Sequence, residues 1–258
     1  MTDDAPPLRA AERALRAIAD AAGDARPRVA GDLADPDIPV AATAVLARDA
    51  VDGVEVLLIE RPDRGSFAGA WVFPGGKLDP EDAGEQGDAT APEEADARRA
   101  AVRETGEETG LEIDAADLVT LSCWDPPPGL PLRIRTWFFV LRAPDGALRL
   151  QPDEAVSAEW MRPADALRRH AAGALTLYPP TWVTLHGLSG AADVDGLLAA
   201  TRVAGPRTFE TQVRRGESGP VFSWRGDAEY DGERADAASA ARHRLEVGSL
   251  PWVYTRSV

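Results

Sequence analysis

Hydrophobic and polar positions change their period several times along the chain, which predicts strands that alternate with helices. Two apolar runs, 39–48 and 54–61, flank the turn-forming sequence Asp-Ala-Val-Asp-Gly and predict a β-hairpin. Further strand-like runs are LVTLSCW, LRIRTWFFVLR and AEWM, and helical patterns follow at PADALRRHAAG and PTWVTLHGLSG. This alternation predicts an α/β layered domain over residues 38–190.

Shorter segments flank this domain on both sides. Residues 8–22 are rich in Ala, Leu and Arg and predict an amphipathic helix, which a polar linker follows. Beyond residue 190, the runs VFSWRGDAEY and HRLEVGSLPWVYTR are β-like but too few for an independent core. We therefore expect an N-terminal helix and linker over 1–37, the domain over 38–190, and a small C-terminal β extension over 191–258 packed on the core.

One further helix carries an unusual acidic face. We expect it to start at Thr90, where Thr-Ala-Pro-Glu fits a capping box, and to stop at Gly110. It places Glu104, Glu107 and Glu108 on one face, where each like-charged pair costs a few tenths of a kcal/mol, roughly, in an isolated helix. The cluster gains from hard divalent cations, Mg²⁺ or Mn²⁺, which bind carboxylate oxygens and hold substrate phosphates. The alternative is a solvated acidic face.

The net charge narrows the classes of partner. The 43 acidic residues outnumber the 28 Lys and Arg, giving a formal charge of −15, which argues against a protein that coats nucleic acid or binds an anionic membrane. A phosphate substrate would need a cation to attract it. Cys123 is the single cysteine, so neither an intrachain disulfide nor a cysteine-based zinc site is expected. The acidic N-terminus lacks the pattern of a signal peptide, and apolar runs are strand length, so we expect a soluble cytoplasmic protein.

Two segments together resemble the signature of a known family. The run WVFPGGK ends in paired glycines, and Arg103–Leu111 reads RETGEETGL. This is similar to the box of the Nudix hydrolases, G-x5-E-x7-R-E-U-x-E-E-x-G-U with U aliphatic, where Gly76 matches the opening glycine and Thr105 is a weak substitute for U. The box glutamate falls on Asp82, and 20 residues (83–102) precede Arg103 where the pattern has 7. Glu81, Asp82 and Glu85 all stay candidates for the carboxylate that pairs with Arg103.

The resemblance implies a fold and a set of roles. The fold class would be α/β, a Nudix-like α/β/α sandwich with a mixed sheet. Glu154, beyond the box, would be a metal ligand or general base, with Asp153 as the alternative. The cofactor would be Mg²⁺ or Mn²⁺, and Arg103 would orient a carboxylate rather than touch substrate. The expected metal ligands are Glu104, Glu107, Glu108 and the carbonyl of Gly76; the expected catalytic residues are Glu107, Glu108, Glu154 and Arg103.

Wider similarity suggests a substrate class. About 130 residues resemble the longer Nudix proteins that include peroxisomal coenzyme A diphosphatases, although Gly65 stands where the coenzyme A motif has an arginine. Coenzyme A or an acyl-CoA is therefore the first expected substrate. The alternatives are a nucleotide-sugar or dinucleotide pyrophosphatase acting on ADP-ribose or NADH, an NTP pyrophosphatase, and a non-catalytic Nudix-fold binding or regulatory protein. The retained glutamates favour an enzyme over the last of these.

The partner expected from this reasoning is a small-molecule nucleoside diphosphate, with no nucleic acid and no membrane. The sequence sets no oligomeric state, and a homodimer is one candidate. Two of the substrate-binding candidates are aromatic residues in proline-stiffened loops, for which core packing is the alternative. The candidate substrate-binding residues are Arg61, Arg64, Lys77, Trp124 and Tyr178.

Overall fold

The computed structural model describes residues 20, 26, 28–29, 31–32, 35, 37–64, 67–84, 92–129, 133–230 and 240–257. The helix expected over residues 8–22 lies outside these residues except for Asp20. The expected capping box at Thr90 and the candidate Glu85 also lie outside them.

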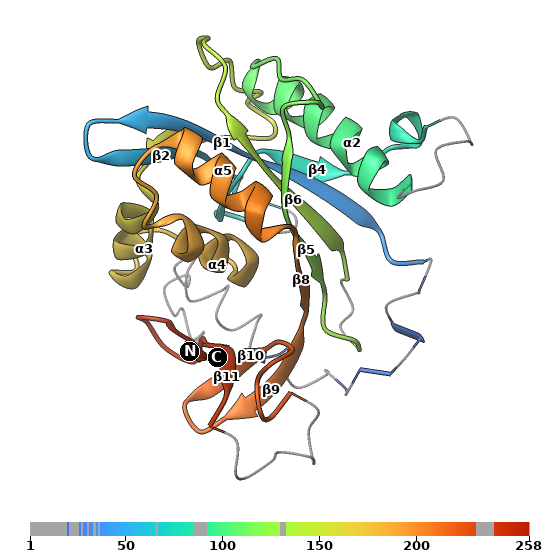
Figure 1. Cartoon of the computed structure of the whole chain (residues 1–258), viewed down its shortest axis with the longest axis vertical. Helices are drawn as coiled ribbons and strands as arrows, with labels where there is room; N and C mark the ends of the chain where they lie inside the picture. Colours follow the sequence, from blue (N-terminus) through green and yellow to red (C-terminus); the bar gives the residue numbers. More distant parts are fainter. Residues whose placement is uncertain are drawn as a thin grey trace, which may run out of the picture.

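A mixed sheet of eight strands forms the centre of the molecule (Figure 1). Its main path runs β3-β2-β1-β6-β5-β8, while β4 pairs with β1 and β7 pairs with β2. The β1–β6 and β5–β8 pairs are parallel and the others antiparallel. The strands are β1 (Val40–Ala50), β2 (Gly53–Glu60), β3 (Trp71–Val72), β4 (Gly75–Lys77), β5 (Val119–Asp125), β6 (Arg135–Arg142), β7 (Ser157–Met161) and β8 (Arg207–Glu210).

Helices cover both faces of this sheet. Figure 1 shows α2 (Pro92–Thr109) on one side, and α3 (Pro163–Ala171), α4 (Pro179–Leu188) and α5 (Val194–Ala204) on the other. Each side has its own apolar core, one built with α2 and one built with α3, α4 and α5. This arrangement confirms the expected α/β/α fold class, the hairpin of β1 and β2, and the end of α2 before Gly110, whose φ is 69°.

The central strand β1 is buried on both faces because its side chains alternate between the two cores. Ala42, Ala44 and Leu46 belong to the core beneath α2, while Val45 and Ala47 belong to the opposite core. The helix contributes Ala97, Ala100 and Ala101 to its core. These small side chains let α2 lie close to β1, and β4 pairs with the same strand through Ala42 and Gly76. The last turns of α2 are thereby held beside β4.

The C-terminal part adds elements to the main layers and a second sheet. Its order is β12-β11-β10-β9. The predicted β-like runs correspond to β10–β12, whereas α5, β8 and β9 were not expected from the pattern. A missed signal for α5 is Asp193, whose side chain accepts a hydrogen bond from the backbone N–H of Gly196 (2.7 Å). The division into segments 1–37, 38–190 and 191–258 stays a proposal. The strands are β9 (Gln212–Gly216), β10 (Gly219–Ser223), β11 (Arg242–Glu246) and β12 (Val253–Ser257).

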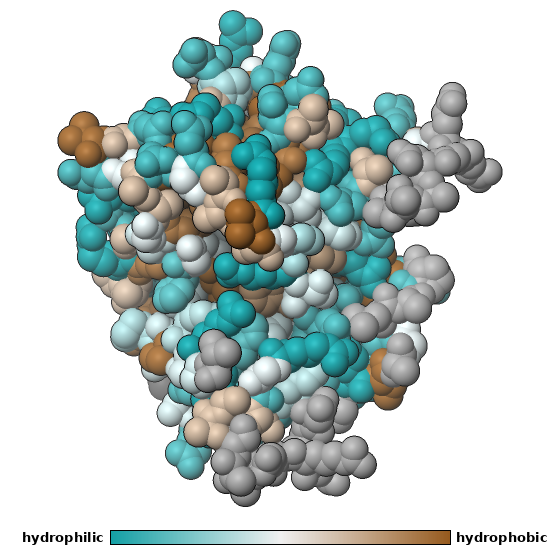
Figure 2. Space-filling view, viewed as in Figure 1, coloured by the Kyte–Doolittle hydropathy of each residue, from teal (hydrophilic) through white to brown (hydrophobic). Residues whose placement is uncertain are grey.

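The face of the molecule in Figure 2 is mostly hydrophilic, with apolar residues in small separate groups. This agrees with the large excess of acidic residues. Within the described ranges, no helix has both the length and the apolar character needed to cross a membrane.

His170 in α3 is a buried titratable group that couples folding to pH. Its side chain is 3% exposed, its Nδ1 lies 3.0 Å from the carbonyl oxygen of Leu175, and its ring contacts Trp252 edge to face. Burial lowers the pKa of His170 from 6.5 to about 4, against the opposing effect of the Leu175 carbonyl. The unfolded chain therefore binds a proton at a higher pH than the folded protein does.

Replacing His170 by Gln should flatten the pH dependence of stability. Because the folded pKa is lowered, the contribution of His170 is complete above its unfolded pKa and is lost as the pH falls toward 4. Between about pH 7.5 and pH 4.5, wild type should lose about 2.5 kcal/mol more unfolding free energy than His170→Gln. Urea denaturation of both proteins across this range measures the difference. Parallel pH curves would contradict the assignment.

Candidate active site

The buried face of α2 changes from apolar to acidic along its length. Ala97, Ala101, Thr105 and Glu108 follow one another at helical spacing, and all four are buried. Thr105 occupies the position where the family pattern has an aliphatic residue. Its hydroxyl donates to the carbonyl oxygen of Ala101 (2.7 Å), so this polar side chain is satisfied inside the core.

Glu108 is the most deeply buried of the three glutamates, at 1% exposed. Its Oε2 accepts a hydrogen bond from the backbone N–H of Gly75 (2.7 Å), and its Oε1 lies 3.7 Å from Nη1 of Arg61. Burial raises the pKa of Glu108 to about 8, with nearby Glu104 and Glu154 adding to the rise, while the Gly75 N–H and Arg61 oppose it. This carboxylate has too little positive charge around it to ionise as easily as a solvated one.

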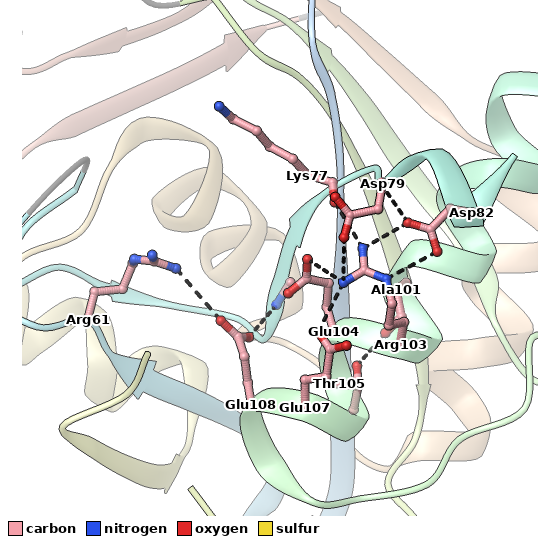
Figure 3. A network of polar contacts seen from close by, with 11 residues as sticks. Arg61, Lys77, Asp79, Asp82, Ala101, Arg103, Glu104, Thr105, Glu107 and Glu108 are labelled. Atoms are coloured by element: carbon pink, nitrogen blue, oxygen red, sulfur yellow. Dashed lines mark hydrogen bonds and ion pairs between the residues drawn. The ribbon is translucent and has the colours of Figure 1, made fainter. Parts of the chain in front are cut away.

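Glu104 and Glu107 share one cation, the guanidinium of Arg103. Nη1 of Arg103 donates to Oε1 of Glu104 and to Oε2 of Glu107, each at 3.0 Å (Figure 3). Burial raises the pKa of Glu104 despite this contact with Arg103, and the charges of Glu107 and Glu154 raise it further. The geometry places the three glutamates in one group, as their spacing on the helix predicts.

Of the candidates Glu81 and Asp82, Asp82 is the carboxylate that holds Arg103; Glu85, the third, lies outside the described residues. Nε of Arg103 donates to Oδ1 of Asp82 (3.2 Å) and Nη2 donates to Oδ2 (2.8 Å). The backbone N–H of Asp79 also donates to Asp82 Oδ2 (2.8 Å), and these bonds outweigh burial, so that the pKa of Asp82 is lowered. Glu81 is exposed and has no such contact among the described residues. Asp82 thus stands where the family pattern has a glutamate, and its carboxylate fixes the guanidinium of Arg103.

Gly76 lies directly against the carboxylate of Glu104. A Cβ atom at this position would overlap the side-chain carboxylate of Glu104, so only glycine permits the observed approach. The paired-glycine turn predicted from the sequence therefore does two things. Gly75 donates its N–H to Glu108, and Gly76 leaves room for Glu104.

Glu154 and Asp153 differ in their surroundings although they are neighbours. Asp153 is exposed and pairs with Arg64 (2.9 Å). Glu154 is partly buried, and its Oε2 has no hydrogen-bond partner among the described residues. Its charge contributes to the raised pKa of both Glu104 and Glu108. The structure thus directs Glu154, rather than Asp153, toward the glutamate group.

The chemistry of these side chains fits a hard divalent cation. Within the part of the chain that the structure describes, no three His, Cys, Asp or Glu side chains are arranged to hold a metal ion. Arg103 and the Gly75 N–H bind the glutamates instead. Every expected donor is nevertheless an oxygen, from three carboxylates and the carbonyl of Gly76, and oxygen is the class of ligand that Mg²⁺ and Mn²⁺ take. Burial is the main cause of the raised pKa of Glu108, so a cation beside this carboxylate would lower its pKa and favour the ionised form.

The basic candidates for substrate binding lie at different distances from this group. Arg61 points toward Glu108, whereas the side chain of Lys77 extends away from the carboxylates (Figure 3). The carbonyl of Lys77, not its ammonium, takes part by accepting from Arg103 (3.1 Å). Arg64 is exposed and bonds the side chain and carbonyl oxygen of Asp153. Of the three, Arg61 is the one that the structure places in contact with a predicted catalytic residue.

The structure argues against Trp124 as a substrate contact. Its side chain is 4% exposed, and its ring stacks on Phe209 at 3.9 Å and contacts Trp224 edge to face. These contacts are explained by core packing, which was the alternative interpretation of Trp124. Tyr178 is partly buried at the start of α4, with its ring edge to face against Phe67 (4.7 Å).

Sequence reasoning missed two backbone contributions to the site. The N–H of Gly75 holds Glu108, and the N–H of Asp79 helps to hold Asp82. The glycine pair and the Asp-Pro turn were visible in the sequence, but the partner of each N–H depends on how β4 and α2 pack.

Comparisons with known proteins agree with this geometry. The NUDIX domain family model matches residues 38–179. The CTP pyrophosphohydrolase of Escherichia coli (strain K12) is 30% identical over 125 residues, which are 48% of this chain and 76% of that protein. A Caenorhabditis elegans protein named for the nudix hydrolases is 31% identical over 123 residues, 46% of this chain and 27% of its own length.

A solved structure shows the same fold. The crystal structure of a NUDIX hydrolase from Alicyclobacillus acidocaldarius aligns with a TM-score of 0.55 and 25% identity, covering 63% of this chain and 96% of that one. The family match spans more than half of the chain and includes the whole glutamate group. The chain therefore belongs to the Nudix family, and it is a pyrophosphate hydrolase.

Proposed function

We propose that this protein hydrolyses the diphosphate bond of a nucleoside diphosphate derivative with the help of a divalent cation. The observation that carries the proposal is the group of Glu104, Glu107 and Glu108 at the end of α2. It is partly buried, and among the described residues Arg103 and Arg61 are the cations that pair with it. Nudix hydrolases generally need divalent metal ions, and Mg²⁺ or Mn²⁺ is the cofactor we propose.

Each residue has a distinct part in this mechanism. Glu104, Glu107 and Glu108 would hold the cation, whose charge would draw in the diphosphate and acidify an attacking water. Glu154 takes the proton from that water as the water displaces one phosphoryl group from the other. Arg103, fixed by Asp82, restrains Glu104 and Glu107 and so positions them. Arg61, which lies beside Glu108, would contact the substrate phosphates.

Coenzyme A or an acyl-CoA is the first substrate candidate. Support comes from the partial coenzyme A motif in the sequence, of which Leu57, Leu58, Arg61 and Gly69 fit. Arg64, next to the position where that motif has arginine, is exposed on the same loop as Arg61. A cytoplasmic location stays a prediction from the sequence.

A nucleoside triphosphate is the second candidate. Similarity to a CTP pyrophosphohydrolase over three quarters of that protein favours it. ADP-ribose and NADH are the remaining candidate substrates, because the glutamate group specifies the reaction and not the leaving group.

A hydrolysis panel tests the proposed function. We expect turnover of at least one of coenzyme A, acetyl-CoA, CTP, ADP-ribose and NADH with Mg²⁺ or Mn²⁺, and none after chelation.

Glu107→Gln should lower kcat/KM about 100-fold or more, since cation stabilisation supplies several kcal/mol. Glu112→Gln, a matched change at an exposed acid outside the group, should retain activity. Equal activity in wild type and Glu107→Gln would refute the proposal. Release of adenosine 3′,5′-bisphosphate would identify coenzyme A cleavage.

Separate substitutions of Glu154 and Asp153 show which of the two neighbouring acids is the general base. Glu154→Gln should lower kcat about 100-fold or more, because positioned proton transfer contributes on that scale. Asp153→Asn should leave kcat nearly unchanged, because Asp153 is exposed and bonds Arg64. Steady-state kinetics of both variants on the best substrate measures the contrast. The reverse ranking would assign the base to Asp153.

Adding one methyl group at Gly76 should disable the site without unfolding the protein. The new Cβ in Gly76→Ala would force the Glu104 carboxylate to move, and we expect kcat/KM to fall about 10- to 100-fold. The melting temperature should change little, because the displaced group is the end of a flexible side chain. Gly190→Ala, where a Cβ meets nothing within 4 Å, is the control. Full activity in Gly76→Ala would show that the position of Glu104 is not critical.

A further inference from the structure

Arg99 lies one turn before Arg103 on α2 and holds the same aspartate. Its Nε donates to the carbonyl oxygen of Asp82 (2.6 Å), and its Nη2 donates to Oδ1 of Asp96. Asp96, Arg99 and Arg103 are spaced three and four residues apart, which places them on one face of the helix. Two successive arginines of α2 thus bind Asp82, Arg103 at its carboxylate and Arg99 at its backbone carbonyl.

The chain just after the 3₁₀ turn η2 (Pro80–Asp82) is fastened to α2 at a second point. The backbone N–H of Gly84 donates to Oδ1 of Asp96 (3.1 Å). A Cβ atom on Gly84 would lie 2.6 Å from Nη2 of Arg99, so the guanidinium packs directly on this part of the backbone. Asp96 and Arg99 therefore bind two peptide groups of one short segment, the Asp82 carbonyl and the Gly84 N–H.

The covalent chain by itself restrains Asp82 only weakly. Twenty residues lie between Asp82 and Arg103, and a longer connection leaves its two ends more freedom to separate. The Asp82 carboxylate nevertheless has to meet Nε and Nη2 of Arg103, whose Nη1 contacts Glu104 and Glu107 (Figure 3). A displacement of Asp82 would move the guanidinium of Arg103, and both glutamates would lose the position that this guanidinium gives them.

An arginine and an aspartate three residues apart on an exposed helix face normally contribute little. Arg168 and Asp165 of α3 form such a pair (2.8 Å), and the Arg168 side chain bonds no other segment among the described residues. Arg99 and Asp96 have the same spacing, but both of their side chains also bond the segment that carries Asp82. This second set of bonds distinguishes Arg99 from an ordinary surface arginine.

We propose that Arg99 is a positioning residue for hydrolysis, acting through Asp82 on Arg103. Paired with Asp96, it fixes the segment after η2, so that the Asp82 carboxylate stays where Arg103 can restrain the glutamates. The inference rests on the proposed cation-dependent hydrolysis, because these glutamates would hold the cation.

Three variants test this role by kinetics. Arg99→Ala should lower kcat/KM about 10-fold at a fixed Mn²⁺ concentration, since small displacements of positioned groups slow a reaction on this scale or more. Gly84→Ala should cause a similar fall, because its new Cβ displaces the Arg99 guanidinium. Arg168→Ala removes the matched pair of α3 and should retain activity. All three positions are exposed, so the melting temperatures should stay within a few degrees of wild type. Full activity in Arg99→Ala, or equal losses in Arg99→Ala and Arg168→Ala, would overturn the inference.

A double-mutant cycle shows whether Arg99 acts through the Asp82 carboxylate. Asp82→Ala removes this carboxylate but keeps the carbonyl that Arg99 binds. In the Asp82→Ala background, Arg99→Ala should lower kcat/KM by less than about twofold more, because the contact with Arg103 is already lost. A fall of about 10-fold in both backgrounds would show independent effects and would contradict the proposed path.

Hydrogen exchange separates this inference from the proposed function. Measured by mass spectrometry without substrate or metal, exchange over residues 79–84 should be faster in Arg99→Ala than in wild type, and unchanged in Arg168→Ala. If no diphosphate is hydrolysed, the proposed function fails, while faster exchange in Arg99→Ala would still support its hold on this segment. Unchanged exchange in Arg99→Ala would refute that hold, whether or not the protein is active.

Discussion

Close packing of the alanine face of α2 on β1 is the contact on which the site depends. Ala97 and Ala101 of the helix lie in one core with Ala42 and Ala44 of the strand. Because β4 pairs with the same strand, the glycine pair is fixed beside the next turns of the helix. Glu104 and Glu108 must then enter the space between helix and turn. Larger side chains in this layer would separate the carboxylates from Gly75 and Gly76.

Burial of these carboxylates creates an electrostatic cost that the protein offsets only in part. Arg103 contacts Glu104 and Glu107 while Asp82 fixes its guanidinium, and Arg61 lies near Glu108. The pKa of Glu108 is still raised to about 8, mainly by burial. A divalent cation would supply the remaining positive charge, which explains how an acidic protein attracts an acidic substrate. Part of the formal charge of −15 thus comes from carboxylates gathered at this site.

Much of the fold was predictable because its signals are local. The hairpin of β1 and β2, the end of α2 and the grouping of Glu104, Glu107 and Glu108 follow from period, turn residues and helical spacing. The partner of Arg103 was not predictable among Glu81, Asp82 and Glu85, since only the turn after β4 determines that Asp82, rather than the adjacent Glu81, faces inward. For Trp124, the sequence left substrate binding and core packing open, because its stacking partner Phe209 lies in a strand that the pattern did not reveal. The same non-local packing defines the pairing of Phe67 with Tyr178.

Binding of Mn²⁺ followed by electron paramagnetic resonance tests the central claim most directly, since it needs no substrate. The account predicts that wild type binds Mn²⁺ and that Glu104→Gln weakens this binding strongly. Glu81→Gln, a change at an exposed acid of the neighbouring turn, should bind like wild type. Unchanged Mn²⁺ binding in Glu104→Gln, or equal weakening in both variants, would contradict a cation site at the end of α2.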